Sequence, residues 1–223
     1  MLPFFAQYVR IMNMRSPNLF PGEQMFVTQT PPETRPLHFA ARAGRTSTIK
    51  ELIDSGAVAS QVNNVGRTAL HEAVIMGRHM TVQNLLENGS NVNETDWNGQ
   101  TALHLIFQGP RVTKSLVLHV LLEYHASIHL QDNNGRTVLH YAAAEHPNDT
   151  TGTNIVKLLV DACREDPKHS LLPVTTLSAK KIINIRDGNG RTALYEAKMA
   201  RNIDIYKLLV DTGGDPFVQP DEV

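Results

Sequence analysis

A four-residue phrase recurs along this chain at nearly constant spacing, and it constrains the fold more than any other feature. The phrase reads Thr-Ala-Leu-His at residues 68–71 and returns, with small changes, at residues 101–104, 137–140 and 192–195. A related version that contains proline ends at His38. The spacing is 33 residues from His38 to His71 and from His71 to His104, then 36 to His140 and 55 to Tyr195. A period between about 20 and 50 residues predicts a stack of repeated structural units.

Two further landmarks keep the same register as this phrase. An aliphatic pair follows each copy, at residues 52–53, 85–86, 121–122, 159–160 and 209–210. An asparagine or aspartate stands three residues before a glycine ahead of four copies, at Asn63, Asp96, Asp132 and Asp187. Three landmarks in one register indicate a true repeat, because a single copy of so short a phrase would carry little weight.

The chain therefore resembles the ankyrin repeat family, whose motif is Thr-Pro-Leu-His-x-Ala at a 33-residue period. The resemblance covers residues 34–216. It implies an all-α ankyrin-repeat solenoid of helix-turn-helix units joined by β-hairpin-like loops. We expect five repeats, at about residues 34–61, 62–93, 94–129, 130–182 and 183–216.

Five segments depart from the regular repeat, and one of them is the turn at residues 146–152, which is five residues longer than the period requires. Residues 1–33 are expected to form a capping or extended segment, because an open-ended stack otherwise exposes the apolar face of its first repeat. The connection at residues 108–113 is three residues longer than the period requires. The fourth repeat contains a longer insertion, which we expect at about residues 164–180 and which is either a recognition loop or disordered. Residues 217–223 form a C-terminal tail.

Composition argues against several classes of partner. The chain has 21 basic and 22 acidic residues, which gives no electrostatic case for binding nucleic acid or an anionic membrane. No apolar run approaches the ~20 residues of a membrane-spanning helix. The single cysteine, Cys163, excludes an internal disulfide framework and fits a reducing compartment. We expect a monomer inside the cell, in the cytoplasm, the nucleus or both.

The sequence offers no catalytic or metal-binding constellation. The motif histidines fall one to each repeat, and repeats stack about 10 Å apart, whereas zinc needs ligands about 2 Å from one ion. The resemblance instead implies a buried histidine that hydrogen bonds beside the motif threonine. His119, His125 and His129 form a weaker cluster without matching carboxylates. We therefore expect neither an enzyme nor a cofactor.

What remains is the surface, where the family usually binds protein partners through its hairpin tips and through the concave face of its first helices. The corresponding tip positions are Asn64, Val65, Trp97, Asn98, Asn133, Asn134 and Asn189. The corresponding concave positions are Phe39, Arg42, Glu72, Ile75, Met76, Leu105, Gln108, Tyr141, Ala144, Glu196 and Met199. Within these two sets we predict a partner-binding site at Trp97, Ile75, Met76, Leu105, Tyr141, Glu72, Arg42 and Asn134, in which Ile75, Met76, Leu105 and Tyr141 form an apolar stripe. The alternative for the stripe is that some of its members pack under adjacent side chains.

Two questions stay open at the level of sequence. Trp97 is either an anchor for a partner or a ring that lies across a neighbouring hairpin and shields its backbone. The main prediction is a non-catalytic protein-binding module. The alternatives are an IκB-like inhibitor of a transcription factor, and a host-directed effector with activity in the non-repeat segments.

Overall fold

The computed structural model describes residues 36–145, 150–164 and 179–217. Helices come in pairs along the chain. The first helices of the pairs are α2 (Pro36–Ala43), α4 (Ala69–Ile75), α6 (Ala102–Leu105), α8 (Val138–Ala143) and α11 (Ala193–Met199). The second helices are α3 (Thr46–Asp54), α5 (His79–Glu87), α7 (Arg111–Glu123), α9 (Thr150–Arg164) and α12 (Ile203–Asp211). A 3₁₀ turn, η1 (Ile106–Gln108), follows α6, and α10 (Ala179–Ile183) precedes the last pair.

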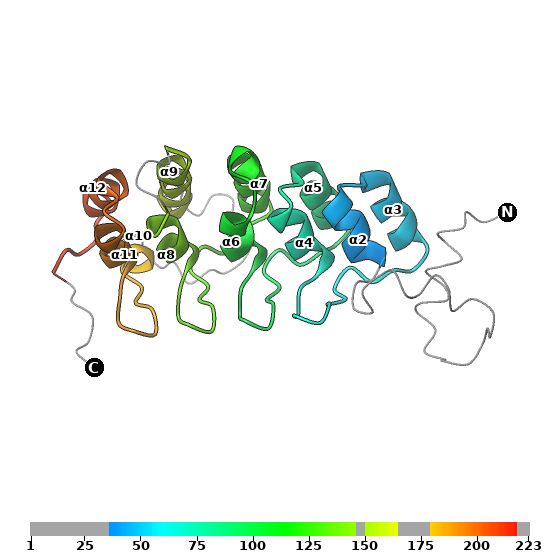
Figure 1. Ribbon diagram of the computed structural model, residues 1–223, viewed down its shortest axis with the longest axis horizontal. Helices are drawn as coiled ribbons and strands as arrows, with labels where there is room; N and C mark the ends of the chain where they lie inside the picture. Colours follow the sequence, from blue (N-terminus) through cyan, green and yellow to red (C-terminus); the bar gives the residue numbers. More distant parts are fainter. Residues whose placement is uncertain (1–35, 146–149, 165–178, 218–223) are drawn as a thin grey trace.

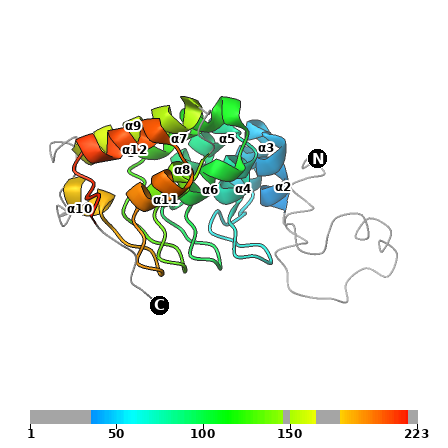
Figure 2. The same cartoon turned by 60° about the vertical axis from the view of Figure 1, so that its left-hand side comes forward.

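The pairs stack into an elongated array with three layers (Figure 1). The second helices form one layer, the first helices lie beneath them, and hairpins project from the opposite side of the first-helix layer. Figure 2 shows these hairpins side by side and pointing the same way. Over the described ranges no strand is assigned, and the hairpins contain one isolated bridge, between Thr95 and Thr101. The predicted all-α ankyrin-type solenoid is therefore confirmed.

Small residues let the first helices approach one another closely. Ala41, Ala69, Ala73 and Ala102 are completely buried, and equivalent alanines follow in α8 and α11. The second helices fill the space between layers with leucine, isoleucine and valine, and the buried side chains form one continuous core. Because each repeat buries its apolar face against its neighbours, stability accumulates along the array.

Each hairpin is held by an acidic or amide side chain at its start. In the hairpin before α6, the backbone N–H of Asp96 donates to Gln100 O over 2.9 Å, and Asp96 Oδ1 accepts from the N–H groups of Asn98 and Gln100. Asn63, Asp132 and Asp187 accept equivalent bonds in their own hairpins. This Asx turn explains the asparagine-or-aspartate landmark in the sequence.

The hairpin glycines are required by the neighbouring hairpin as well as by their own backbone. Gly66, Gly99 and Gly135 have φ between +73° and +78°, where a side chain is unfavourable. A Cβ added to any of them would also lie 2.5–2.8 Å from a backbone nitrogen of the next hairpin. The hairpins are thus in backbone contact, and a side chain at these positions would separate them.

The irregular repeats differ in detail from the sequence prediction. The connection expected at residues 108–113 is partly helical, because α7 begins at Arg111, directly after Pro110. Proline favours a helix start, since its missing N–H would be unpaired there in any case. The added residues therefore lengthen α7 to 13 residues rather than forming a longer loop.

The other irregular segments lie mostly outside the described residues. Of the insertion expected at 164–180, Arg164 ends α9 and Ala179 begins α10, and residues 165–178 are not described. The predicted capping segment, residues 1–33, and all but Phe217 of the predicted tail, residues 217–223, are also outside the described ranges. The proposed repeat boundaries remain predictions.

Two helix ends carry a side chain where equivalent repeats have glycine. Arg201 has φ of 57° and takes the place of Gly44 and Gly77, and His125 has φ of 61° and takes the place of Gly56 and Gly89. A left-handed conformation costs a residue with a side chain roughly 1–2 kcal/mol.

We therefore expect Arg201→Gly to stabilise the protein by about 0.5–1 kcal/mol, after the greater chain entropy of glycine is deducted. The measurement is the midpoint of urea unfolding at an unchanged m-value. The matched control is Gly77→Ala, which should destabilise because the added Cβ would lie 2.1 Å from Thr113 Oγ1. A lower midpoint for Arg201→Gly would contradict the prediction.

Candidate protein-binding surface

The first-helix face does not carry the predicted apolar stripe. Leu105, one of its four members, is completely buried, and Ile75, Met76 and Tyr141 are partly buried. The prediction that Leu105 is exposed was wrong, because neighbouring repeats cover the position that directly follows the motif histidine. The large apolar side chains that are exposed on first helices are Phe39 and Met199, in the first and last described repeats.

Glu72 is also absent from the accessible surface, because it joins two repeats. Glu72 is only 4% exposed. Arg42 Nη1 donates to Glu72 Oε2 over 2.8 Å, and Asn63 Nδ2 donates to Glu72 Oε1 over 3.1 Å. Both carboxylate oxygens are therefore engaged inside the protein. Arg42 keeps a side chain that is 48% exposed, but its charge is already paired.

Tyr141 has a similar internal role. Its hydroxyl donates to Asp132 Oδ2 and accepts from Gln100 Nε2 over 2.8 Å, and its ring packs edge-on against His104 with 5.9 Å between ring centres. Burial, followed by the hydrogen bond to Asp132, raises the pKa of Tyr141 to about 12. These bonds fix the side chain between two hairpins and occupy its hydroxyl.

Arginines complete this network between hairpins and first helices. Arg67 Nε lies 3.4 Å from Asp96 Oδ2, and Arg136 Nε lies 3.7 Å from Asp187 Oδ2. Arg136 also approaches Glu196, with 3.6 Å between Nη2 and Oε1. Each of these pairs crosses from one repeat to the next. The charged side chains here thus serve mainly to join repeats.

The hairpin tips have a different character. We call residues 64–65, 97–98, 133–134 and 188–189 the tip ridge. All eight residues are exposed, and none is charged. Backbone bonds connect the ridge from one hairpin to the next, from Trp97 N to Val65 O (3.2 Å), Asn133 N to Asn98 O (2.9 Å) and Gly188 N to Asn134 O (2.7 Å). The ridge is therefore a pre-organised surface.

Trp97 is the largest side chain on this ridge. It is 66% exposed, and Val65, on the adjoining hairpin, is 41% exposed. A Cβ placed on Gly66 would lie 2.3 Å from Trp97 Cδ1, so the indole edge rests against the preceding hairpin. The ring thus contacts a neighbouring hairpin, as one of the two sequence interpretations expects, and most of its surface faces solvent. That Trp97 anchors a partner stays a prediction. Asn134, the other predicted tip residue, is exposed as well.

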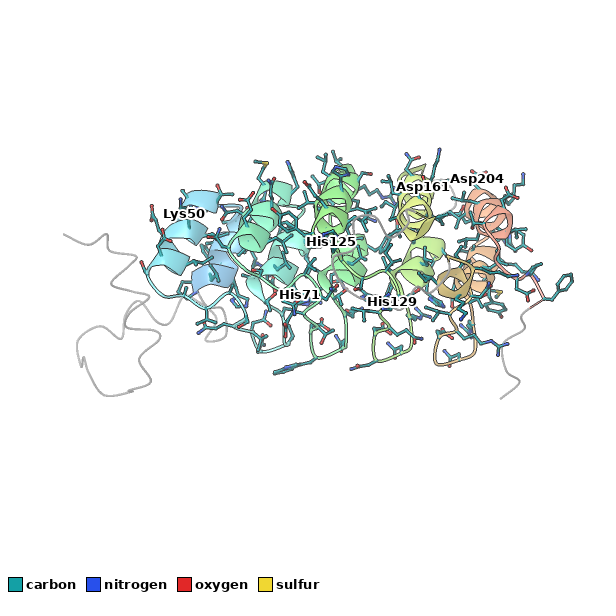
Figure 3. The ribbon with its side chains drawn as sticks, turned by 180° about the vertical axis from the view of Figure 1, so that it is seen from behind. Lys50, His71, His125, His129, Asp161 and Asp204 are labelled. Atoms are coloured by element: carbon teal, nitrogen blue, oxygen red, sulfur yellow. The ribbon has the colours of Figure 1, made fainter. Side chains whose placement is uncertain are left out.

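The motif histidines are buried connectors, as the family resemblance implies. Thr68 and His71 form a capping box in which His71 Nδ1 accepts from Thr68 N over 3.0 Å. Because Nδ1 accepts, the ring proton is placed on Nε2, which donates to Glu94 O over 3.1 Å. His104 and His140 repeat the arrangement, and their Nε2 atoms bond to Leu130 O and Arg191 O. Figure 3 shows His71 at the junction between the hairpins and the first-helix layer.

One buried charged pair was missed from the sequence. Lys114 is 4% exposed, its Nζ donates to Glu145 Oε1 over 2.9 Å, and it lies 5.2 Å from the centre of the Phe107 ring. Its spacing offered a signal, because residue 114 lies four and seven positions before the buried residues Leu118 and Leu121. A lysine in the core register of a helix predicts a buried partner of opposite charge.

Among the residues that the structure describes, no group of three or more histidine, cysteine or acidic side chains is placed to hold a metal ion, and His119, His125 and His129 form no such group. Cys163 belongs to α9, but its side chain is outside the described set. Within the same ranges, every helix is too short or too polar to cross a bilayer.

Stacked helix pairs with a connected row of hairpins define an α-helical repeat solenoid. The family model for ankyrin repeats matches the chain three times, over residues 18–96, 81–170 and 114–220. The chain therefore belongs to the ankyrin repeat family, which generally acts in protein–protein interaction and is generally non-catalytic. No curated protein gives a significant match to the sequence.

The histidine connectors predict that acid destabilises the array. Burial lowers the pKa of His71, His104 and His140 below the ordinary value of 6.5, although the nearby carboxylates of Asp96, Asp132 and Asp187 oppose the shift. The unfolded chain then binds more protons than the folded one between the lowered pKa and 6.5. The stabilisation is present above pH 6.5 and is lost as pH falls through the folded-state pKa.

We expect the free energy of unfolding to fall between pH 7.5 and 5.5, measured by urea unfolding at each pH. His71→Gln should remove about a third of this dependence, since three histidines contribute. Met80, which is exposed on α5 and does not titrate, supplies the control, and Met80→Gln should leave the slope unchanged. A free energy of unfolding that does not change between pH 7.5 and 5.5 would contradict the prediction that burial keeps these histidines neutral.

Proposed function

We propose that this protein is a protein-binding module whose contact surface is the tip ridge, with Trp97 and Val65 as its apolar pair. The exposure of Trp97 carries the proposal, because a large aromatic side chain at this position is not needed by the other hairpins. Asn133 and Gly188 stand at the equivalent positions. Exposed tryptophan is enriched among residues that contribute most to protein interfaces.

The predicted site residues on the first helices stabilise the array beneath the tip ridge and add little accessible surface to it. Glu72, Arg42 and Tyr141 use their polar groups inside the array, and Leu105 is buried. These contacts hold successive hairpins in register and so fix the position of Trp97. A rigid surface of this kind binds with little loss of conformational entropy.

The chemistry of the ridge also indicates the kind of partner. Amide side chains and one apolar pair line it, and the acidic groups beneath, such as Asp96, are engaged by their own turns. We infer a partner segment that is mostly uncharged and that places an apolar side chain between Trp97 and Val65. The single cysteine fits a reducing compartment, and we propose that the protein acts inside the cell, in the cytoplasm or nucleus, as a monomer.

The first test is to identify the partner by proximity labelling and mass spectrometry, and then to change Trp97→Ala. We expect binding to weaken by more than about 2 kcal/mol, while stability falls by less than about 1 kcal/mol. Met80 supplies the control, since it is 60% exposed on α5, away from the ridge, and Met80→Ala should leave affinity unchanged. A large loss of stability with unchanged affinity would show that Trp97 is structural.

The second test uses salt. Because the ridge is uncharged, we expect the affinity of the identified partner to change by less than about threefold between 50 and 300 mM NaCl. Titration calorimetry at the two concentrations measures this. A fall of tenfold or more would place charged groups in the interface and would favour the first-helix face over the ridge.

A further inference from the structure

Three arginines stand at the same position of the first three repeats. Arg45, Arg78 and Arg111 each follow the motif histidine of their repeat by seven residues, so they recur at the 33-residue period. All three are exposed. They lie where the first helix of a pair turns into the second, at the start of α3, α5 and α7. We call these three residues the arginine row.

The turns that carry the row rest on one another. Arg78 Nε donates to Arg42 O over 3.3 Å, which joins the second turn to the first. A Cβ placed on Gly77 would lie 3.0 Å from Pro110 Cδ, so the third turn lies against the second. Helices packed side by side in this way are about 8–10 Å apart. The row therefore presents one arginine about every 8–10 Å along a continuous edge of the array.

The equivalent position of the fifth repeat shows which residue the helix itself favours. Asn202 is the N-cap of α12, and its Oδ1 accepts from Ile205 N over 3.2 Å. Arg45 has nearly the same backbone angles, with φ of −91° and ψ of 82° against −87° and 86° for Asn202, but its side chain makes no cap hydrogen bond. Arg78 makes none either. Because asparagine stabilises an N-cap and arginine does not, local folding does not account for the row.

The row forms a positive edge on a chain whose total charge is balanced. The first turns of α3, α5 and α7 contain no acidic residue. Within the described ranges, no carboxylate pairs with Arg45 or Arg78. Arginine binds a carboxylate through two parallel N–H donors, so these side chains suit an acidic ligand.

An apolar patch adjoins the row at its third member. Val112, which directly follows Arg111, is 90% exposed, and Leu116 is 51% exposed. Leu116 lies four residues further along α7, so the two side chains share one face of the helix. A ligand with apolar side chains as well as carboxylates fits this combination, whereas a phosphate polymer has no side chain to place on the patch.

We propose that the arginine row binds an extended acidic segment of a protein partner, with carboxylates three residues apart at Arg45 and Arg78 and an apolar side chain on Val112 beyond them. A polyproline II segment has three residues per turn and advances about 9 Å in that turn, which matches the spacing of the row. The hairpins come directly before the first helices and the row directly after them, so the row and the tip ridge lie at opposite ends of these helices. Binding at the row is therefore independent of the function proposed for the ridge.

The test uses a synthetic peptide as its probe. A fluorescein-labelled peptide of four Glu-Pro-Val units has a glutamate at every third residue, and we expect fluorescence anisotropy to show that it binds the full chain at about 50 mM NaCl. A peptide of the same composition with its glutamates adjacent should bind at least about fivefold more weakly, because their spacing no longer matches the row. Absence of binding, equal binding of the two peptides, or tighter binding of a single-stranded oligonucleotide of equal charge would overturn the proposal.

Arg45→Asn separates recognition from folding. The new side chain should cap α3 as Asn202 caps α12 and so raise the midpoint of urea unfolding, whereas affinity for the peptide should fall about tenfold. The matched control is Lys207→Gln, which removes one positive charge from the exposed surface of α12 and should change affinity by less than about twofold. Trp97→Ala should leave peptide binding unchanged, so a failure of the ridge proposal would not affect this one. An unchanged affinity or a lower unfolding midpoint in Arg45→Asn would overturn the inference.

Discussion

The two-ended hydrogen bonding of the motif histidine is the interaction on which the rest of the structure depends. One ring nitrogen, as in His71, completes the cap of its own first helix, and the other bonds to the backbone that enters the next hairpin. A single buried side chain therefore couples the local order of one repeat to the position of its neighbour. Because the imidazole must be neutral to accept at Nδ1 and donate at Nε2, this coupling also depends on the dry interior that keeps it neutral.

Most of the fold could be predicted from the sequence, because each recurring residue has the same structural role in every repeat. The asparagine or aspartate closes a turn through its own side chain, and the glycine three residues later provides a positive φ and a close approach. These are local requirements, so they are visible in a short stretch of sequence. The buried role of His71, His104 and His140 followed from the family resemblance and is confirmed by their bonds.

The candidate surface was harder to predict, since exposure depends on the neighbouring repeats and not on the repeat itself. Glu72, Leu105 and Tyr141 occupy one equivalent position, and each is covered in a different way: by a salt bridge, by packing and by a shared hydroxyl. Phe39 stands at the same position in the first described repeat and is 55% exposed. Family knowledge places such residues on a face, but only the contacts across repeats show whether they reach solvent.

The same dependence applies to the regular features of the repeat. Each described motif histidine bonds to a carbonyl of the following hairpin, and Tyr195 stands at this position in the fifth repeat. A glycine is needed most where a neighbour leaves no room, as Gly77 shows against Thr113, whereas Arg201 tolerates a positive φ with its side chain in solvent. The choice of residue at each position of this array is therefore limited by the number of neighbours that the position contacts. Sequence variation at positions such as Arg201 reflects fewer contacts, and variation on the tip ridge, where all residues are exposed, is free to serve recognition.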